Sequence, residues 1–390
     1  MNGQGYGRPA PVATLPLTRV GPGSPCGEFL RRYWHPLALS SSVGPRPTKV
    51  RLLGEDLILF RDAVGRPGLL YPRCMHRGTS LYYGRIEERG IRCCYHGWLF
   101  DVQGNCLEQP CEPDGGRHRE KARQPWYPLE EKYGLVFAYL GPPSKQPLLP
   151  RYDILEDLEE GERIANEDGT RFGQQGDRGV PIMPYTWLHT LDNFMDPFHV
   201  YVLHSTFTVT QFAAGFAVLP KVKFEYVRGG IVYRAERILQ DGQRMTRVSC
   251  LMAPNAASVP DIDLAAARSS TISWTVPLDD THHQSFRAVR TRLSDDELFK
   301  PLRYGDKTWS EMTPEERRDM PGDLEAQGGQ GPVTLNSEEH LVTSDRGIIM
   351  LRRLLLEQIR AVGTGTDPIG VNFDPDKQIV AIPSGNFYDD

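Results

Sequence analysis

Two short pairs of cysteine and histidine are the clearest chemical feature of this sequence. Cys74 and His76 form a Cys-x-His pair, and Cys93 and His96 form a Cys-x-x-His pair a short distance further along. A glycine-containing turn follows each pair. Thiolate sulfur and neutral imidazole nitrogen are both ligands of zinc and of iron. The four residues therefore predict a metal site held between two loops.

The division of ligands between the loops favours one metal over the other. Zinc fingers pair cysteine with cysteine and histidine with histidine, and a helix carries the second pair. Here each loop supplies one of each, which suits a Rieske [2Fe–2S] cluster, where one iron takes two thiolates and the other takes two imidazoles. The glycines allow backbone N–H groups to approach the cluster sulfides. The stretches C-M-H-R-G-T-S-L and C-C-Y-H-G-W-L-F-D resemble the two cluster loops of Rieske oxygenases.

A second group of candidate ligands has the pattern Asp-x-x-His-x-x-x-x-His, formed by Asp196, His199 and His204. On an ideal α-helix the two histidines lie about 140° apart, so one metal binds both only if the helix is widened, as a π-bulge would do. Asp196 precedes Pro197 and so also has the chemistry of a helix N-cap. From spacing alone, the histidines are also compatible with two core residues and Asp196 with a simple cap.

Across nearly the whole chain the sequence resembles the terminal oxygenases of aromatic-ring Rieske systems. The resemblance implies that His199 and His204 bind a mononuclear Fe(II) as part of a facial triad, and that O2 reacts there beside the substrate. The segment that ends in Ser344 and Asp345 resembles the phthalate-dioxygenase branch, which makes Asp345 the expected third ligand. Glu338 and Glu339 are its alternatives as the carboxylate.

The resemblance also implies partners. Asp196 is expected to connect a cluster histidine of one subunit, His96, to an iron ligand of the next subunit, which requires a closed ring and hence a homotrimer. Asn193 is expected to face the iron pocket. Electrons are expected from a separate NAD(P)H-dependent reductase of the flavin or ferredoxin type. The alternative is a Rieske-type electron carrier with a ligand-binding C-terminal domain.

The phthalate-dioxygenase branch acts on aromatic acids, by ring hydroxylation or by oxidative O- or N-dealkylation. A buried carboxylate needs a charge partner, and arginine is best suited because its planar fork binds both oxygens. The strand-borne candidates are Arg244, Arg247, Arg287, Arg290 and Arg292. Side-chain alternation places Arg290 and Arg292 on the opposite face from Arg287. We select Arg244 and Arg290, together with Asn193, as predicted substrate contacts.

The elements that position these residues predict an α+β fold. Residues 1–22 are rich in glycine and proline and are expected to form a flexible arm. Residues 23–145 are expected to form a small all-β Rieske domain, which opens with a short helix over residues 29–36. Residues 146–390 are expected to form a catalytic domain in which helices pack on a curved antiparallel sheet, a helix-grip arrangement. Its predicted strands and main helix have these bounds: 222–226, 231–238, 245–252, 270–276 and 284–293 for strands, and 340–362 for the helix.

Composition excludes several classes of protein. The chain has 390 residues and a formal net charge of -5, so it has no basic excess for binding nucleic acid. Its seven cysteines are too few, and odd in number, for a disulfide framework. The sequence contains no long apolar run, so it predicts no membrane span. We therefore expect a cytoplasmic protein without a membrane segment.

The segment 301–336 is long for a loop and is expected to be an active-site cover or a flexible excursion.

Overall fold

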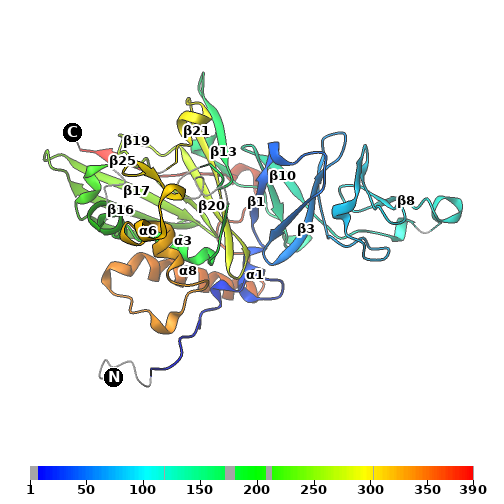
Figure 1. Cartoon of the computed structure of the whole chain (residues 1–390), viewed down its shortest axis with the longest axis horizontal. Helices are drawn as coiled ribbons and strands as arrows, with labels where there is room; N and C mark the ends of the chain where they lie inside the picture. Colours follow the sequence, from blue (N-terminus) through cyan, green and yellow to red (C-terminus); the bar gives the residue numbers. More distant parts are fainter. Residues whose placement is uncertain (1–7, 118, 172–180, 208–212, 302, 390) are drawn as a thin grey trace.

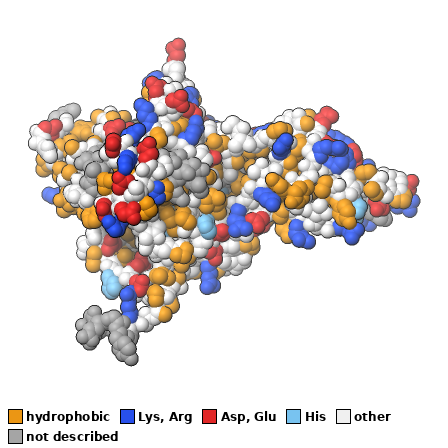
Figure 2. Space-filling model, in the orientation of Figure 1, with side chains coloured by type: hydrophobic (Ala, Val, Ile, Leu, Met, Phe, Trp, Pro, Cys, Tyr) orange, Lys and Arg blue, Asp and Glu red, His pale blue; other side chains and the backbone are white. Residues whose placement is uncertain are grey.

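The computed structural model describes residues 8–117, 119–171, 181–207, 213–301 and 303–389. An arm of small β-sheets projects from a larger domain in which helices lie against a broad sheet (Figure 1). Side chains of both charges are interspersed over the visible face, and the surface of the arm carries several apolar groups (Figure 2). No helix in the described ranges has both the length and the apolar character needed to cross a bilayer.

Three antiparallel sheets make up the arm. The first has the order β1-β11-β10, the second β2-β3-β4-β9, and the third, which carries a cluster loop, β5-β6-β7-β8. Their bounds are β1 Trp34–Leu39, β2 Thr48–Leu52, β3 Glu55–Arg61, β4 Pro67–Leu70, β5 Arg85–Glu87, β6 Gly90–Arg92, β7 Leu99–Phe100, β8 Cys106–Glu108, β9 Trp126–Tyr127, β10 Leu129–Lys132 and β11 Leu135–Tyr139.

The arm has two cores. Around the cluster loops, Phe60, Ile91 and Phe100 pack with Cys74 and Cys93 in a separate apolar cluster. The sheet nearest the larger domain instead shares that domain's core. At this junction the rings of Phe137 on β11 and Trp274 on β20 (Thr271–Asp279) meet edge to face, with centroids 5.5 Å apart. The tip of the arm is therefore stabilised independently, whereas its base is packed onto the larger domain.

A ten-stranded antiparallel sheet forms the larger domain, with the main order β13-β21-β20-β18-β17-β16-β15. β14, β19 and β25 pair at its margins, and β12 pairs separately with β24 in a parallel ladder. Besides β20, the bounds are β12 Arg151–Tyr152, β13 Arg163–Glu167, β14 Ile182–Met183, β15 Lys221–Val227, β16 Gly230–Ile238, β17 Arg244–Met252, β18 Ala256–Ser258, β19 Ala267–Arg268, β21 His282–Thr291, β22 Arg303–Tyr304, β23 Lys307–Thr308, β24 Ile379–Val380 and β25 Gly385–Tyr388.

Helices α3 and α8 lie against one face of this sheet (Figure 1). α3 packs on β20 and β21, and α8 packs on α3. At Gly347 of α8 an added Cβ would lie 2.5 Å from the ring of Phe224 on β15, so only glycine allows the helix to approach this closely. The helix bounds are α1 Pro25–Leu30, α3 Trp187–Phe194, α4 His199–Val202, α5 Asp295–Leu298, α6 Pro314–Asp319, α7 Asp323–Gly328 and α8 Arg346–Gly363.

The predicted α+β architecture is confirmed, since a small all-β part precedes a domain of helices on an antiparallel sheet. The five predicted strands correspond to β15, β16, β17, β20 and β21, and α8 corresponds to the predicted main helix but begins later. The helix expected over residues 29–36 is wrong in its bounds, because α1 ends at Leu30 and β1 begins at Trp34.

The prediction that residues 1–22 form a flexible N-terminal segment also needs correction. Residues 1–7 lie outside the described part of the chain. Leu17 and Val20 are fully buried in the main core, and the carbonyl of Leu17 accepts hydrogen bonds from the indole of Trp187 and the thiol of Cys26. The segment around these two apolar residues is therefore part of the folded domain.

Candidate metal centres

The two cluster loops have the same backbone design. In each loop the cysteine N–H donates to a carbonyl further along, at 2.8 Å for Cys74 and 2.9 Å for Cys93. The N–H of a glycine then donates back to the cysteine carbonyl, at 2.7 Å for Gly78 and 3.1 Å for Gly97. Both glycines have positive φ, +78° and +71°, a region that disfavours other residues. The glycines therefore fix two matching turns.

The four predicted cluster ligands face one another across these turns. The rings of His76 and His96 lie 4.6 Å apart, and Cys74 and Cys93 are buried and in side-chain contact. The two thiols thus lie together and the two imidazoles lie together. This division matches a Rieske cluster, in which one iron takes two cysteines and the other takes two histidines.

Burial raises the pKa of the Cys74 thiol to about 12, and the neighbouring Cys93 sulfur adds to the effect. A pair of buried thiolates is unfavourable by itself because each charge is poorly solvated and repels the other. A bound metal reverses this, since it stabilises thiolates directly. The chemistry of this donor set therefore fits a cluster.

Three further residues support the loops, and sequence reasoning missed them in this role. Gln124 is buried; its Oε1 accepts from the N–H of Met75 at 2.8 Å, and its Nε2 donates to two carbonyls. Arg92 donates to the Gly97 carbonyl at 2.6 Å. Trp98 stacks on His76 at 4.5 Å with an interplanar angle of 4°. These contacts hold both loops and one ligand ring in place.

The second candidate site begins where the chain leaves α3. After α3 ends at Phe194, α4 carries His199, and the helix then widens into a π-helical turn over Leu203–Phe207 that carries His204. The expected π-helical widening is confirmed. It brings the two imidazole rings to a centroid separation of 5.4 Å, so both face one point.

A carboxylate from a different element completes this group. Asp323, the first residue of α7, places Oδ1 3.3 Å from Nε2 of His204 and 3.8 Å from Nε2 of His199. The three ligand atoms all lie within 4.8 Å of one another. Two imidazole nitrogens and a carboxylate oxygen that converge in this way are the donor set of a mononuclear iron site. The residues present therefore fit that metal.

Asn193 supports the carboxylate by donating from Nδ2 to Oδ1 of Asp323 at 2.7 Å. The expectation that Asn193 faces the iron pocket thus has a structural counterpart, although the contact is with a candidate ligand. Burial alone would raise the pKa of Asp323, but the adjacent His204 and His199 and the hydrogen bond from Asn193 outweigh it and lower the pKa. The carboxyl group is therefore held ionised, as a metal ligand must be.

Asp196 lies directly beside His199. Its Oδ1 accepts from the N–H groups of Phe198 and His199, at 2.9 and 3.3 Å, which makes it a local cap. Its carbonyl oxygen pairs with Nδ1 of His199, and its Oδ2 lies 3.9 Å from the same nitrogen. These contacts fix the imidazole so that Nε2 points toward Asp323.

The structure does not bring the predicted third ligand, Asp345, into the group formed by the two histidines, and Asp323 lies there instead. Asp345 ends a turn of 3₁₀-helix before α8, and its Oδ2 accepts from the N–H of Val342 at 2.6 Å. The alternatives are also engaged elsewhere, because Glu339 pairs with Arg352 at 2.6 Å and Glu338 pairs with Arg8. Each of these carboxylates has a structural role away from the two histidines.

The structure places both predicted substrate contacts, Arg244 and Arg290, in ion pairs within the chain. Arg244 lies at the exposed start of β17 and pairs with Asp389 at 3.2 Å. Arg290 pairs with Glu162 at 2.5 Å. Their even-numbered positions put both on the face of the sheet away from the helices. Neither side chain reaches the candidate iron site.

Sequence reasoning missed Asp323 because no local pattern marks it. It lies in the segment 301–336, which was expected to be an active-site cover or a flexible excursion and which contains α6 and α7. The available signal was its place after Pro321 and Gly322, at the start of a short helix with an acidic first turn. Such a signal indicates a helix terminus and does not by itself indicate a ligand.

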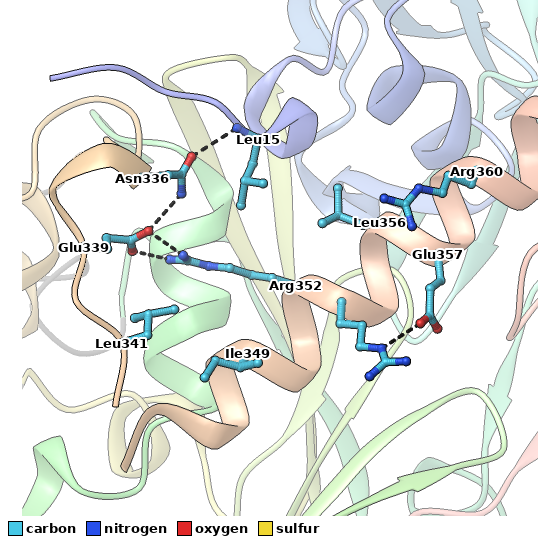
Figure 3. Close-up of a pocket in the computed structure, with 10 residues that line it drawn as sticks. Leu15, Asn336, Glu339, Leu341, Ile349, Arg352, Leu356, Glu357 and Arg360 are labelled. Carbon is cyan, nitrogen blue, oxygen red and sulfur yellow. Dashed lines mark hydrogen bonds and ion pairs between the residues drawn. The ribbon is translucent and has the colours of Figure 1, made fainter. Parts of the chain in front are cut away.

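A groove of about 600 Å³ runs along α8 (Figure 3). Arg352 reaches from α8 to Glu339 at the groove wall and also pairs with the buried Asp192 of α3 at 2.6 Å. The candidate ligands do not line this groove. The Asp192–Arg352 pair instead joins α3 to α8 and so supports the helix that precedes the ligands.

The chain is similar to known proteins along most of its length. Residues 33–128 match the Rieske [2Fe-2S] domain family. The chain is 57% identical to phenoxybenzoate dioxygenase subunit alpha of Ectopseudomonas oleovorans, over 95% of this chain and 91% of that protein. It is 34% identical to the tert-butanol monooxygenase / tert-amyl alcohol desaturase oxygenase subunit of Aquincola tertiaricarbonis, over 92% and 78%.

Among solved structures, NdmA of Pseudomonas putida CBB5 with caffeine has a similar fold. The TM-score is 0.64 at 20% identity, and the match covers 90% of this chain and 98% of that one. At this identity the likeness concerns the fold alone.

Proposed function

The chain belongs to the Rieske non-heme iron oxygenases, in a branch like phthalate dioxygenase, and we propose that His199, His204 and Asp323 hold its mononuclear iron. The protein is the oxygenase component of a multicomponent system that uses O2 and electrons from a separate reductase. When bound, the [2Fe–2S] cluster supplies single electrons and the mononuclear iron supplies O2 activation. The observation that carries the proposal is the approach of Asp323 Oδ1 to both imidazoles, at 3.3 and 3.8 Å.

The cluster is proposed to lie between Cys74, His76, Cys93 and His96, in the paired turns at the tip of the arm. Around the iron, each protein group has a separate task. The carbonyl of Asp196 orients His199, and Asn193 holds the Asp323 carboxylate. His204 is almost fully buried, which keeps water away from one side of the site. These residues position the metal and limit access to it.

Asp196 is also proposed to connect this site to the cluster of a neighbouring subunit through that subunit's copy of His96, within a homotrimer. In support, the Asp196 carboxylate lies beside His199 and its side chain is 26% exposed, so a second chain can reach it. The electron source is proposed to be an NAD(P)H-dependent reductase of the flavin or ferredoxin type. The ring of subunits predicts a mass of about three chains in solution.

Replacing Asp196 with Asn tests this connection. Both metals should remain bound, because the carboxylate is not proposed as a ligand, but reoxidation of the reduced cluster by O2 and substrate should slow. Rapid mixing followed at the cluster absorbance measures that rate. Reoxidation as fast as in the wild type would leave Asp196 only its capping role.

The substrate is proposed to be an aromatic carboxylate with an ether or alkyl substituent, oxidised by ring hydroxylation or by oxidative dealkylation. The support is 57% identity to a protein named for phenoxybenzoate. The test is O2 uptake and product mass with 3-phenoxybenzoate, phthalate, 3-methoxybenzoate and, as a neutral aliphatic compound, tert-butanol. Turnover of the acids supports the proposal, and formaldehyde from the methoxy compound would identify demethylation. Turnover confined to the neutral compound would contradict it.

A further inference from the structure

Two buried arginines lie side by side on the helix-covered face of the sheet. In the register of β16 and β17, Arg237 is opposite Met245, and Ala235 is opposite Arg247. Residues opposite each other in an antiparallel pair share a face, so the two arginines are diagonal neighbours on one face. Their exposed fractions are 3% and 5%. Arg234, by contrast, is on the other face of β16 and pairs with Glu225.

The two guanidinium groups have different partners. Arg247 donates to the carbonyls of Pro260 and Asp261 and to the side chain of Asn386, at 2.6 to 2.9 Å. Arg237 donates from Nε to the Val218 carbonyl at 3.0 Å, while its Nη1 is buried and has no hydrogen-bond partner. In the ranges that the structure describes, neither arginine forms an ion pair with a carboxylate.

An arrangement of this kind is costly unless an anion completes it. A buried charge without a counter-charge loses its hydration and gains nothing in return. Consistent with this, burial and the nearby Arg247 lower the pKa of Arg237 to about 10. The strand arginines Arg290 and Arg292 do not share this property, because both pair with glutamates. Arg237 is thus a cation held ready for an external anion.

The pair lies close to the candidate iron site. Phe216 packs over both arginines, with guanidinium to ring-centroid distances of 5.3 Å for Arg237 and 5.2 Å for Arg247. The same ring belongs to a small apolar cluster against which Val200 packs. Val200 follows His199 on α4. One layer of side chains therefore separates the arginine pair from the helix that carries the proposed iron ligands.

We propose that Arg237 binds the carboxylate of the aromatic substrate, and that Arg247 is a positioning residue that holds this part of the sheet in place. The proposal rests on the proposed oxidation of aromatic acids at the iron site. The free edge of the guanidinium donates to a carboxylate oxygen, a charge-assisted contact that a neutral substrate cannot make. The substrate carboxylate would be bound at the sheet, and the aromatic rings of the substrate would lie toward α4.

The test is equilibrium binding to the metal-loaded oxygenase, measured by titration calorimetry with 3-phenoxybenzoate and its neutral analogue 3-phenoxybenzamide. Arg237→Gln should weaken binding of the acid by about 30-fold, the usual effect of losing a hydrogen bond to a charged group, and binding of the amide by less than about threefold. Arg234→Gln, on the opposite face of the same strand, should change neither affinity. Arg237→Lys keeps the charge and should weaken binding of the acid less than Arg237→Gln does.

The unchanged visible spectrum and melting temperature of each variant establish that it is folded. If Arg237→Gln does not fold, Arg237→Lys provides the test, because it should weaken binding of the acid and not binding of the amide. Equal loss of acid and amide, or no loss of either, would overturn the role of Arg237 while leaving the proposed function intact. A wild-type protein that binds the amide but not the acid would overturn both.

Discussion

The two proposed metal centres are built from the chain in different ways. Each cluster loop supplies one cysteine and one histidine within a single turn, and the two turns repeat the same backbone hydrogen bonds. The proposed iron centre takes two histidines from one irregular helix and its carboxylate from Asp323, in a segment far along the chain. The first design is local, and the second depends on how α7 packs against α3. A local design can be read from spacing, whereas a design assembled by packing cannot.

The difference also concerns sensitivity to change. The cluster loops have their own apolar core at the tip of the arm. The iron carboxylate depends on contacts such as that from Thr190 of α3 to Gln327 of α7, at 2.7 Å. Substitutions at one centre should therefore leave the metal of the other centre in place, and the following predictions test this separation.

The largest effect is expected at the cluster. Because thiolate donates more charge to iron than neutral imidazole does, His76→Cys should lower the cluster's reduction potential by at least about 100 mV. The mononuclear iron content should not change. Redox titration followed by EPR measures the first quantity, and metal analysis measures the second. His282→Cys, at a partly exposed histidine of β21, is the matched control. An unchanged potential and EPR spectrum in His76→Cys would remove His76 from the site.

An intermediate effect is expected around the iron. Asn193→Ala removes the hydrogen bond to Asp323 and should lower the affinity for mononuclear iron about 10- to 100-fold, as is usual when a ligand loses its supporting contact. Iron titration of the metal-depleted protein measures this affinity, and the cluster spectrum should stay the same. Asn105→Ala, an exposed position in the arm, should have no effect. Equal iron affinity in Asn193→Ala and the wild type would contradict the assigned support.

The smallest effect is expected at the junction between the arm and the larger domain. The buried Glu156 accepts from Tyr133 at 2.5 Å and pairs with Lys132 and Arg151. Burial alone would raise its pKa, but these partners outweigh burial and lower the pKa to about 2, from an ordinary value of 4.5. A lowered folded-state pKa gives stability that is present above the unfolded pKa and is lost as the pH falls through the folded pKa.

Glu156→Gln should therefore reduce the free energy of unfolding by about 1–3 kcal/mol at neutral pH, with the difference shrinking below about pH 4. Urea unfolding at several pH values measures it. The contents of both metals should not change, since the contact serves the junction and neither centre. A difference that is constant with pH would contradict the assignment to an ionised Glu156.

The extent to which sequence predicts this molecule follows from the same distinction. The predicted cluster ligands rest on the spacing and flanks of two Cys–His pairs. The five-residue spacing of His199 and His204 indicates that the helix must widen if both bind one metal, and the π-helical turn is found there. The sequence favours Asp345 because its segment resembles the phthalate-dioxygenase branch, yet its carboxylate accepts from the N–H of Val342 in the turn before α8. Side-chain alternation correctly placed Arg287 and Arg290 on opposite faces of β21. It could not say which of the two faces the helices cover, because that depends on the packing of the whole sheet.

The central claim is that one chain holds a [2Fe–2S] cluster and a separate iron whose carboxylate ligand is Asp323. The most direct measurement is iron and acid-labile sulfide per chain in the wild type, Asp323→Ala and Asp345→Ala. The wild type and Asp345→Ala should contain about three irons and two sulfides, and Asp323→Ala about two of each. Loss of the third iron in Asp345→Ala, with its retention in Asp323→Ala, would contradict the account.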